Sequence, residues 1–243
     1  MHFKLEVIGF TIDGCIAAQS AGANRIELCD NPGEGGTTAS YGFIKAAREK
    51  LTIELYPIIR PRGGDFLYSD QEFEIMKTDI SICKEMGCDG VVIGILNADG
   101  TIDKKRNGQL VEVAYPMGVT FHRAFDRVID APQALEDLVQ IGCERILTSG
   151  LLANALDGAA TIKQLIKQAG GRIIIMPGSG LRSDNIAAIA QQTGAVEFHT
   201  SARVFAKSKM EYISMGINEN LQSVAVDEAE VRRIVEVLHN YGR

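Results

Sequence analysis

The chain has 243 residues, 46% of them hydrophobic and 23% charged, a composition typical of a globular protein with one substantial core. Its formal net charge is −6 and it has no long basic run, which argues against nucleic-acid binding. No apolar stretch approaches the roughly 18 residues of a membrane span, and the start MHFKLEVIGF is typical of a strand, not a signal peptide. Five irregularly spaced cysteines without a signal peptide predict reduced thiols and a cytoplasmic location.

Four segments of the chain repeat one pattern. Each has a glycine after a helix-like stretch, then a short polar step and a β-rich run. Glycine adopts a positive φ at little cost, so each segment predicts a helix that ends at the glycine and a strand that follows it. The four segments are AGANRIELC (21–29), MGCDGVVIG (86–94), IGCERILTS (141–149) and TGAVEFHTS (193–201).

Four further strands are predicted between these segments, at 4–10, 52–60, 119–124 and 172–178. Helical patterns separate the strands near 11–21, 40–49, 70–86, 104–114, 132–141, 158–169, 183–193 and 227–240. Strict alternation of strands and helices predicts a parallel sheet, and eight such units at this length predict a (β/α)8 TIM barrel formed by a single domain, residues 1–243. An open doubly wound sheet is the alternative. Residues 207–223 are expected to form a flexible insertion before the last helix.

Several ionisable residues are predicted to point into this barrel. Side chains alternate between the two faces of a strand, and the apolar positions face the helices, so the polar positions between them face inward. The inward residues that are candidates for catalysis are Glu6, Glu27, Arg60, His122 and His199. The first, second and eighth strands are neighbours in a closed barrel, so we expect Glu6, Glu27 and His199 to lie close together. Arg123 is expected on the opposite face, paired with Asp126.

Each of these residues alone has an ordinary structural explanation, because barrel interiors can hold satisfied ion pairs. The group of five favours function, since burying charge is costly and proteins tend to accept that cost at functional sites.

A candidate phosphate site follows the last two predicted strands of the barrel. The segments PGSGL (177–181) and HTSAR (199–203) come directly after them, where barrels of this type often bind phosphate through backbone N–H groups and a helix N-terminus near Ser183. Arg60 or Arg62, from the loop RPRGGDFLYSD (60–70), is expected to approach from across the mouth. A tight turn is the alternative explanation of the glycines. The candidate anion-binding residues are Gly178, Ser179, Gly180, Ser201, Ala202 and Arg62.

One cysteine is predicted to face the barrel mouth. Cys29 lies two positions after Glu27 and is either a ligand for a soft metal or a small packing residue. Cys88 and Cys143 occupy a position where the other repeats have alanine, which indicates packing. Cys83 lies on a predicted helix and has no partner at ligand spacing.

The motifs RIELC, GG-T-SYG, IRPRGGDFLYSD-E, GVVIGIL-ADG-ID, TFHRAFD, RILTSG, IMPGSG and EFHTSA together resemble the CutC family of copper homeostasis proteins, from residue 4 to about residue 203. The resemblance implies a (β/α)8 barrel, a cytoplasmic location, homo-oligomers such as a dimer, and a role in handling Cu(I). Two positions depart from the family pattern: Ile8 stands where a cysteine is frequent, and Ala39 stands where a proline is usual. The loss of a thiol at position 8 leaves Cys29 as the one predicted thiol at the mouth.

Two functions therefore remain open, with a metal ion or a small molecule as the partner. The family resemblance favours Cu(I) handling, with Cys29 and nearby His or Glu residues as ligands. The residue types favour an enzyme that acts on a small phosphorylated or anionic metabolite, with Glu6, Glu27 or His122 as acid and base and Arg60 holding the anion.

Overall fold

The computed structural model describes residues 3–214, 216 and 219–242 of the chain. Its strands are β1 (Lys4–Gly9), β2 (Arg25–Leu28), β3 (Glu54–Pro57), β4 (Gly90–Ile93), β5 (Gly118–Phe121), β6 (Arg145–Thr148), β7 (Ile174–Pro177), β8 (Glu197–Thr200), β9 (Arg203–Ala206) and β10 (Ser223–Val226). Its α-helices are α1 (Ile12–Ser20), α2 (Tyr41–Lys50), α3 (Asp70–Glu85), α4 (Lys104–Ala114), α5 (Ala131–Ile141), α6 (Ala159–Ala169), α7 (Ile186–Thr193) and α8 (Glu228–Tyr241). Two short 3-10 helices are η1 (Pro32–Glu34) and η2 (Arg123–Arg127).

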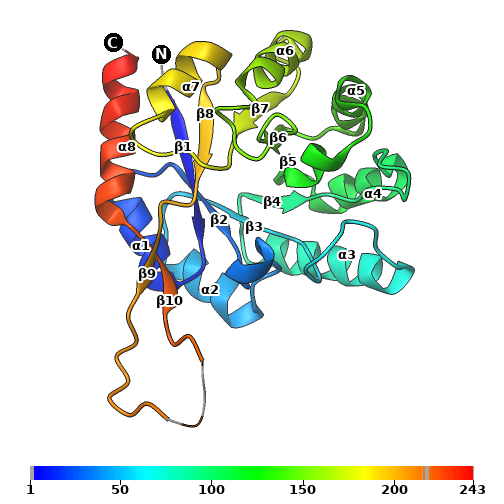
Figure 1. The fold of residues 1–243 in the computed structure, drawn as a ribbon. Helices are drawn as coiled ribbons and strands as arrows, with labels where there is room; N and C mark the ends of the chain where they lie inside the picture. Colours follow the sequence, from blue (N-terminus) through cyan, green and yellow to red (C-terminus); the bar gives the residue numbers. More distant parts are fainter. Residues whose placement is uncertain (1–2, 215, 217–218, 243) are drawn as a thin grey trace.

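Strands β1 to β8 form the predicted (β/α)8 barrel. They pair in parallel in two groups, in the orders β3-β2-β1-β8 and β4-β5-β6-β7. A parallel bridge between Ile58 and Val92 joins the two groups at one seam, and β7 lies beside β8 at the other. The helices α1 to α8 surround the strands (Figure 1). The alternative of an open doubly wound sheet is therefore wrong.

The helices begin and end within three residues of the predicted bounds, and the largest difference is at α7, which begins at Ile186 and not near Ser183. Side chains such as Ser69 and Asp227 accept backbone N–H groups at helix starts, and at Ser69 Glu72 completes a capping box. The repeated glycines adopt a positive φ at the helix ends, for example +88° at Gly142 and +78° at Gly194. The sequence repeat thus marks the points where α1, α3, α5 and α7 stop and the chain turns into the next strand.

The main hydrophobic core lies between the strands and the helices. Outward-facing residues such as Ile26 and Leu28 are fully buried there. Inside the barrel the apolar cluster is much smaller: Ile8, Cys29, Tyr56, Ile58 and Val92. Most of the remaining interior is polar, as the period-two pattern predicts.

The described residues of the segment 203–226 form an arm, and the predicted insertion, residues 207–223, lies mostly between its two strands. Strands β9 and β10 pair in antiparallel register, and the arm projects away from the ring of helices (Figure 1). Its base packs on the barrel, where Val226 lies against Gly14 of α1. In the part of the chain that the structure describes, no helix combines the length and the hydropathy needed to cross a membrane.

Candidate active site

The floor of the barrel is a buried ion network centred on Arg25. The guanidinium of Arg25 donates to the carboxylates of Glu6 and Glu197, with a distance of 2.7 Å to Glu197, and to Glu54 at 3.0 Å. Arg145 reaches the same oxygen of Glu197 at 2.7 Å. Arg25 is fully buried and Arg145 is 1% exposed, so both guanidinium charges depend on these carboxylates for neutralisation.

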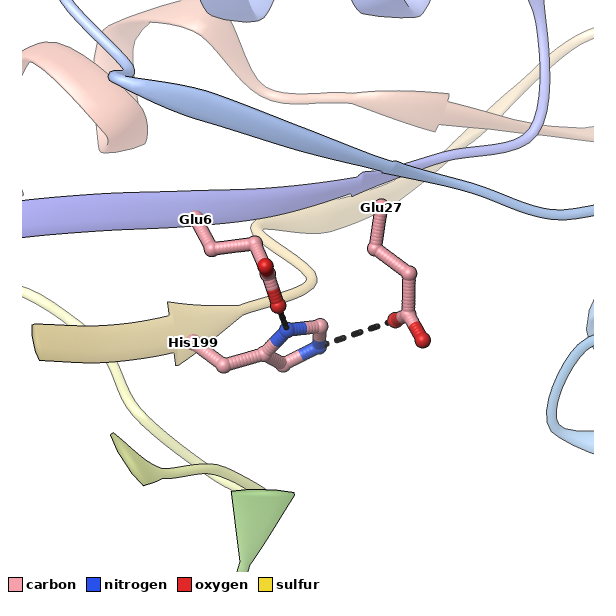
Figure 2. A group of neighbouring side chains, drawn as sticks. All are labelled: Glu6, Glu27 and His199. Carbon is pink, nitrogen blue, oxygen red and sulfur yellow. Dashed lines mark hydrogen bonds and ion pairs between the residues drawn. The ribbon is translucent and has the colours of Figure 1, made fainter. Parts of the chain in front are cut away.

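Above this floor, three side chains from neighbouring strands converge as the sequence predicts. Glu6 comes from β1, Glu27 from β2 and His199 from β8 (Figure 2). Nδ1 of His199 lies 2.7 Å from Glu6 Oε1, and Nε2 lies 3.8 Å from Glu27 Oε2. An ionised carboxylate can only accept, so Nδ1–H donates to Glu6 and Nε2 is left facing Glu27.

The surroundings move the pKa values of the two glutamates in opposite directions. Burial acts to raise the pKa of Glu6, but the charge of Arg25 and the hydrogen bond from His199 lower it to about 2. Burial raises the pKa of Glu27 to about 7, because the opposing attraction of His199 is smaller than the cost of burying its charge. Burial acts to lower the pKa of His199, but its hydrogen bond to Glu6 and the charge of Glu27 raise it overall.

These three residues can therefore move a proton near neutral pH. Glu6 is an anion at neutral pH and orients the imidazole, Glu27 has a pKa of about 7, and the pKa of His199 is raised above its ordinary value. Such a pair, with one partner fixed by a second carboxylate, is suited to general acid–base catalysis.

A cavity of about 550 Å³ opens at the carboxyl ends of the strands. Its wall comes from the segments that follow β2, β3, β5 and β6, and it consists of Gly33, Glu34, Gly35, Arg60, Gly64, Phe66, Arg123, Asp126, Arg127, Leu151 and Leu152. Three arginines and two acids line it, so the wall carries a small excess of positive charge. Active sites of (β/α)8 barrels lie at this end.

Arg60 lines this cavity, and His122 packs against Phe66, another residue of its wall. Neither takes part in the hydrogen bond and ion pair that join Glu6, His199 and Glu27. Arg60 donates to three carbonyl oxygens, those of Glu34, Gly36 and Gly64, at 2.6–2.8 Å. His122 caps η2 instead of extending strand β5, and its Nδ1 accepts the N–H of Ala124.

Gly94 makes room for His122. A Cβ at position 94 would lie 2.3 Å from the imidazole. Burial and the charge of Arg60 lower the pKa of His122 to about 3, so it is neutral at physiological pH.

The alternation of strand side chains predicted Arg123 on the opposite face of the strand, and this prediction is wrong. The chain leaves β5 at Phe121 and turns into η2, so strand periodicity no longer applies, and Arg123 lines the cavity. Its predicted pairing with Asp126 is confirmed at 2.7 Å. Sequence reasoning also missed Arg127 and Phe66. The charged run in TFHRAFDR, directly after a strand, was the available indication of Arg127.

The candidate phosphate residues after β7 and β8 lie elsewhere. Gly178 packs closely on Leu147 and His199, and Ser179 donates to the carbonyl of Ala153 at 2.9 Å. Within the described part of the chain, Gly178, Ser179 and Gly180 contribute nothing to the cavity wall.

Hydrogen-bond donors near that segment already have acceptors within the protein. Glu230 accepts both the N–H and the hydroxyl of Ser183, where the sequence suggested a helix N-terminus for phosphate. Ser201 lies beside strand β10, and the N–H of the buried Ala202 donates to Thr200. Arg62 pairs with Asp65 and Glu72, away from the cavity wall.

Cys29 lies inside the barrel, but it is fully buried. Its Sγ faces Gly36, and burial raises the pKa of its thiol well above the usual range. The thiol of Cys83 hydrogen-bonds with that of Cys88, and this bond is the main cause that lowers the pKa of Cys88. All five cysteines are free thiols.

The donor atoms of the barrel do not fit Cu(I). Among the described residues, one group of at least three His, Cys, Asp or Glu side chains could hold a metal, and it is Glu6, Glu27 and His199, with ligand atoms within 4.8 Å of one another. It supplies two carboxylates and one imidazole, whereas Cu(I) prefers thiolates and thioethers. Glu6 is moreover already bound to Arg25.

A model of the CutC family matches residues 3–204 of the chain. A family protein CutC of Chromobacterium violaceum is 52% identical over 220 residues, covering 90% of this chain and 89% of that protein. The copper homeostasis protein cutC homolog of Homo sapiens is 44% identical over 236 residues, covering 96% of this chain and 86% of that protein. The crystal structure of CutC from Streptococcus agalactiae matches with a TM-score of 0.78 at 36% identity, covering 82% of this chain and 98% of that one.

Proposed function

The chain belongs to the CutC family, and from this premise we propose that it is an enzyme that performs general acid–base chemistry on a small anionic metabolite. The observation that carries the proposal is Glu27, a buried carboxyl with a pKa of about 7, 3.8 Å from an imidazole that Glu6 orients. Glu27 and His199 exchange the proton with the substrate, and Glu6 is a positioning residue. The arginine-lined cavity supplies the preference for an anion.

A purely structural role explains Arg25 and its partners but not Glu27. Among the described residues, no group hydrogen-bonds to the carboxylate of Glu27, and its one ion pair within 4.0 Å is with His199. A carboxyl that only stabilised the fold would be expected to have a hydrogen-bond donor or a guanidinium beside it, as Glu6 and Glu197 have. Proton transfer at neutral pH instead requires a carboxyl whose pKa lies near 7.

The test is a panel of phosphorylated and carboxylated metabolites, followed by NMR in deuterated water. We expect the wild-type protein to convert at least one compound, or to exchange one of its protons for deuterium, and we expect Glu27→Gln to be inactive on that compound. Turnover by Glu27→Gln at the wild-type rate would contradict the proposal.

Copper handling is a second candidate, and the name of the human relative supports it. Cys29 would be the thiol involved, but its burial and the oxygen-rich surroundings do not favour Cu(I). We expect no Cu(I) affinity that depends on Cys29 in the native protein. Competition with a chromogenic Cu(I) chelator, comparing wild type with Cys29→Ser, measures this. Stoichiometric binding that Cys29→Ser abolishes would favour copper handling over catalysis.

The proposal places the protein in the cytoplasm, where five free thiols are stable. It also includes a homodimer formed through the arm. The tip of the arm gathers exposed apolar side chains around one groove, among them Tyr212 at 75% and Ile213 at 63% exposure. Monomers rarely expose such a patch, and the family resemblance implies a second copy of this chain as its partner.

We expect sedimentation equilibrium to give a dimer for the wild type and a monomer for the double variant Tyr212→Ser, Ile213→Ser. The substitutions remove apolar area at the tip and leave the base of the arm on the barrel intact. The double variant Tyr115→Ser, Ile129→Ser, which alters exposed apolar residues elsewhere, is the matched control and should remain dimeric. A monomeric wild type at high micromolar concentration, or a dimeric tip variant, would refute the role of the arm.

A further inference from the structure

Two buried hydrogen-bond donors beside the cavity lack an acceptor. They are Nε of Arg60 and Nε2 of His122, whose residues are only 5% and 4% exposed. Nδ1 of His122 accepts the N–H of Ala124, so in the neutral ring the proton is on Nε2. Buried polar groups are nearly always paired, and two unpaired donors near each other indicate that an acceptor is missing.

The charge of Arg60 is also without a counter-ion. Its other nitrogens donate to carbonyl oxygens, and among the described residues no carboxylate lies within 4.0 Å of it. The other buried arginines in the described part of the chain, Arg25 and Arg145, are paired with glutamates. Carbonyl dipoles solvate a guanidinium only in part, so a buried and unpaired cation is a site where an anion gains stability.

Phe66 brings these groups together. The guanidinium of Arg60 lies 5.0 Å from the centroid of its ring, that of Arg127 lies 5.8 Å from it, and the imidazole of His122 lies 4.8 Å from it. Arg60, Phe66 and Arg127 all line the cavity. Arg127 is exposed and has no ion-pair partner in the described part of the chain, whereas Asp126 neutralises Arg123.

We infer that the part of the cavity between Arg60, Phe66 and Arg127 binds an oxyanion of the substrate, a phosphate or a carboxylate. Both groups only accept hydrogen bonds when ionised, which matches a wall that offers unpaired donors and two uncompensated guanidinium groups. The inference rests on the proposed function and deepens it. It places the anion at the cavity wall formed by the segments after β3 and β5, and not at the segments after β7 and β8 that the sequence predicted.

A short series of contacts links Arg60 to the strand that carries Glu27. Cys29 follows Glu27 by two residues, directly after the end of β2 at Leu28, and its side chain belongs to the apolar cluster inside the barrel. A Cβ on Gly36 would lie 3.1 Å from Cys29 Sγ, and the carbonyl of Gly36 accepts from Arg60 at 2.8 Å. The buried thiol of Cys29 and the backbone of Gly36 thus lie between the proposed anion subsite and the carboxyl of Glu27.

Calorimetric titration and thermal denaturation with inorganic phosphate and, separately, with acetate test the subsite. We expect saturable binding to the wild type, and Arg127→Met should weaken it by about tenfold or more because one charge-assisted contact is lost. His122→Asn removes the Nε2 donor but keeps an oxygen that can cap Ala124, so it should also weaken binding while the fold persists. Tighter binding of phosphate than of acetate would identify the dianion as the preferred ligand, and the reverse order would identify the carboxylate.

The matched control is Arg172→Met, which removes an exposed arginine paired with Glu136 and should leave the affinity unchanged. Absence of saturable binding to the wild type, or equal affinity in Arg127→Met and wild type, would overturn the subsite. Titration of Glu27→Gln separates this result from the proposed catalysis, because that substitution leaves the anion wall intact. Phosphate binding that survives in an inactive Glu27→Gln supports both proposals; binding in a Glu27→Gln variant that remains active would refute the catalytic role and keep the subsite.

Discussion

Glu27→Gln is expected to lower kcat by about 10²–10⁴-fold on the substrate that the metabolite panel identifies, the range that a positioned acid or base contributes. Glutamine keeps the size and polarity of the side chain but cannot take up or release a proton. The wild-type rate should vary with pH around 7, where the carboxyl titrates, and the residual rate of the variant should lack that step. Initial rates across roughly pH 5–9 measure both effects, because this range extends to both sides of the near-neutral pKa that suits a catalytic acid or base.

Glu144→Gln is the matched control, because this glutamate pairs with Arg145 and hydrogen-bonds Tyr56 at the other end of the barrel. It should change kcat by no more than about twofold, as expected of a partly exposed residue away from the chemistry. Equal losses in the two variants would indicate a general effect on the barrel instead of a role for Glu27.

The titration of Glu27 also predicts a pH dependence of stability that needs no substrate. Folding raises the pKa of this carboxyl from its ordinary value of 4.5 to about 7, so the folded protein binds the proton more tightly than the unfolded chain. The resulting stabilisation is complete below the ordinary pKa of 4.5 and is lost as the pH rises through about 7. Relative to Glu27→Gln, the wild type should lose on the order of 3 kcal/mol of unfolding free energy over that interval. Parallel stability curves for the two proteins would contradict the raised pKa.

Arg25→Met is expected to lower the free energy of unfolding by about 3–5 kcal/mol, the usual result of removing one partner from a buried ion pair. Arg25 bonds Glu6, Glu54 and Glu197, and the variant leaves the buried carboxylates of Glu6 and Glu197 with much less compensating charge. Urea denaturation at neutral pH, analysed with the slope as well as the midpoint, measures the loss.

Arg172→Met serves as the control for Arg25, because its pair with Glu136 is exposed and should contribute about 0–1 kcal/mol. A loss below about 1 kcal/mol in Arg25→Met would mean that Glu6 and Glu197 protonate or relax at little cost. In that case Glu6 would not be the fixed anion that orients His199, and the acid–base proposal would lose its positioning residue.

The sequence by itself determined the alternation of strands and helices and the side chains that face into the barrel. Both follow from local stereochemistry: a strand repeats every two residues, and glycine marks the helix ends because it adopts a positive φ. The proximity of Glu6, Glu27 and His199 then follows from closing eight strands into a ring, and the distances among them confirm it.

Only the tertiary structure decided which contacts these side chains make. Strand periodicity cannot predict a turn such as η2, which carries Arg123 and Arg127 to the cavity. Strand periodicity also cannot predict that Glu230 accepts a hydrogen bond from the N–H of Ser183, or that the thiols of Cys83 and Cys88 hydrogen-bond. These contacts join segments whose relative placement depends on packing.

The same holds for the opposite pKa shifts of two glutamates on neighbouring strands. Glu6 and Glu27 are the same residue type at inward positions, and both are buried. Arg25 bonds to Glu6 and to no oxygen of Glu27. Burial therefore outweighs the opposing charges at Glu27, whereas at Glu6 the charge of Arg25 and the hydrogen bond from His199 together outweigh burial. An electrostatic field depends on distances in three dimensions, and only the folded chain sets those distances.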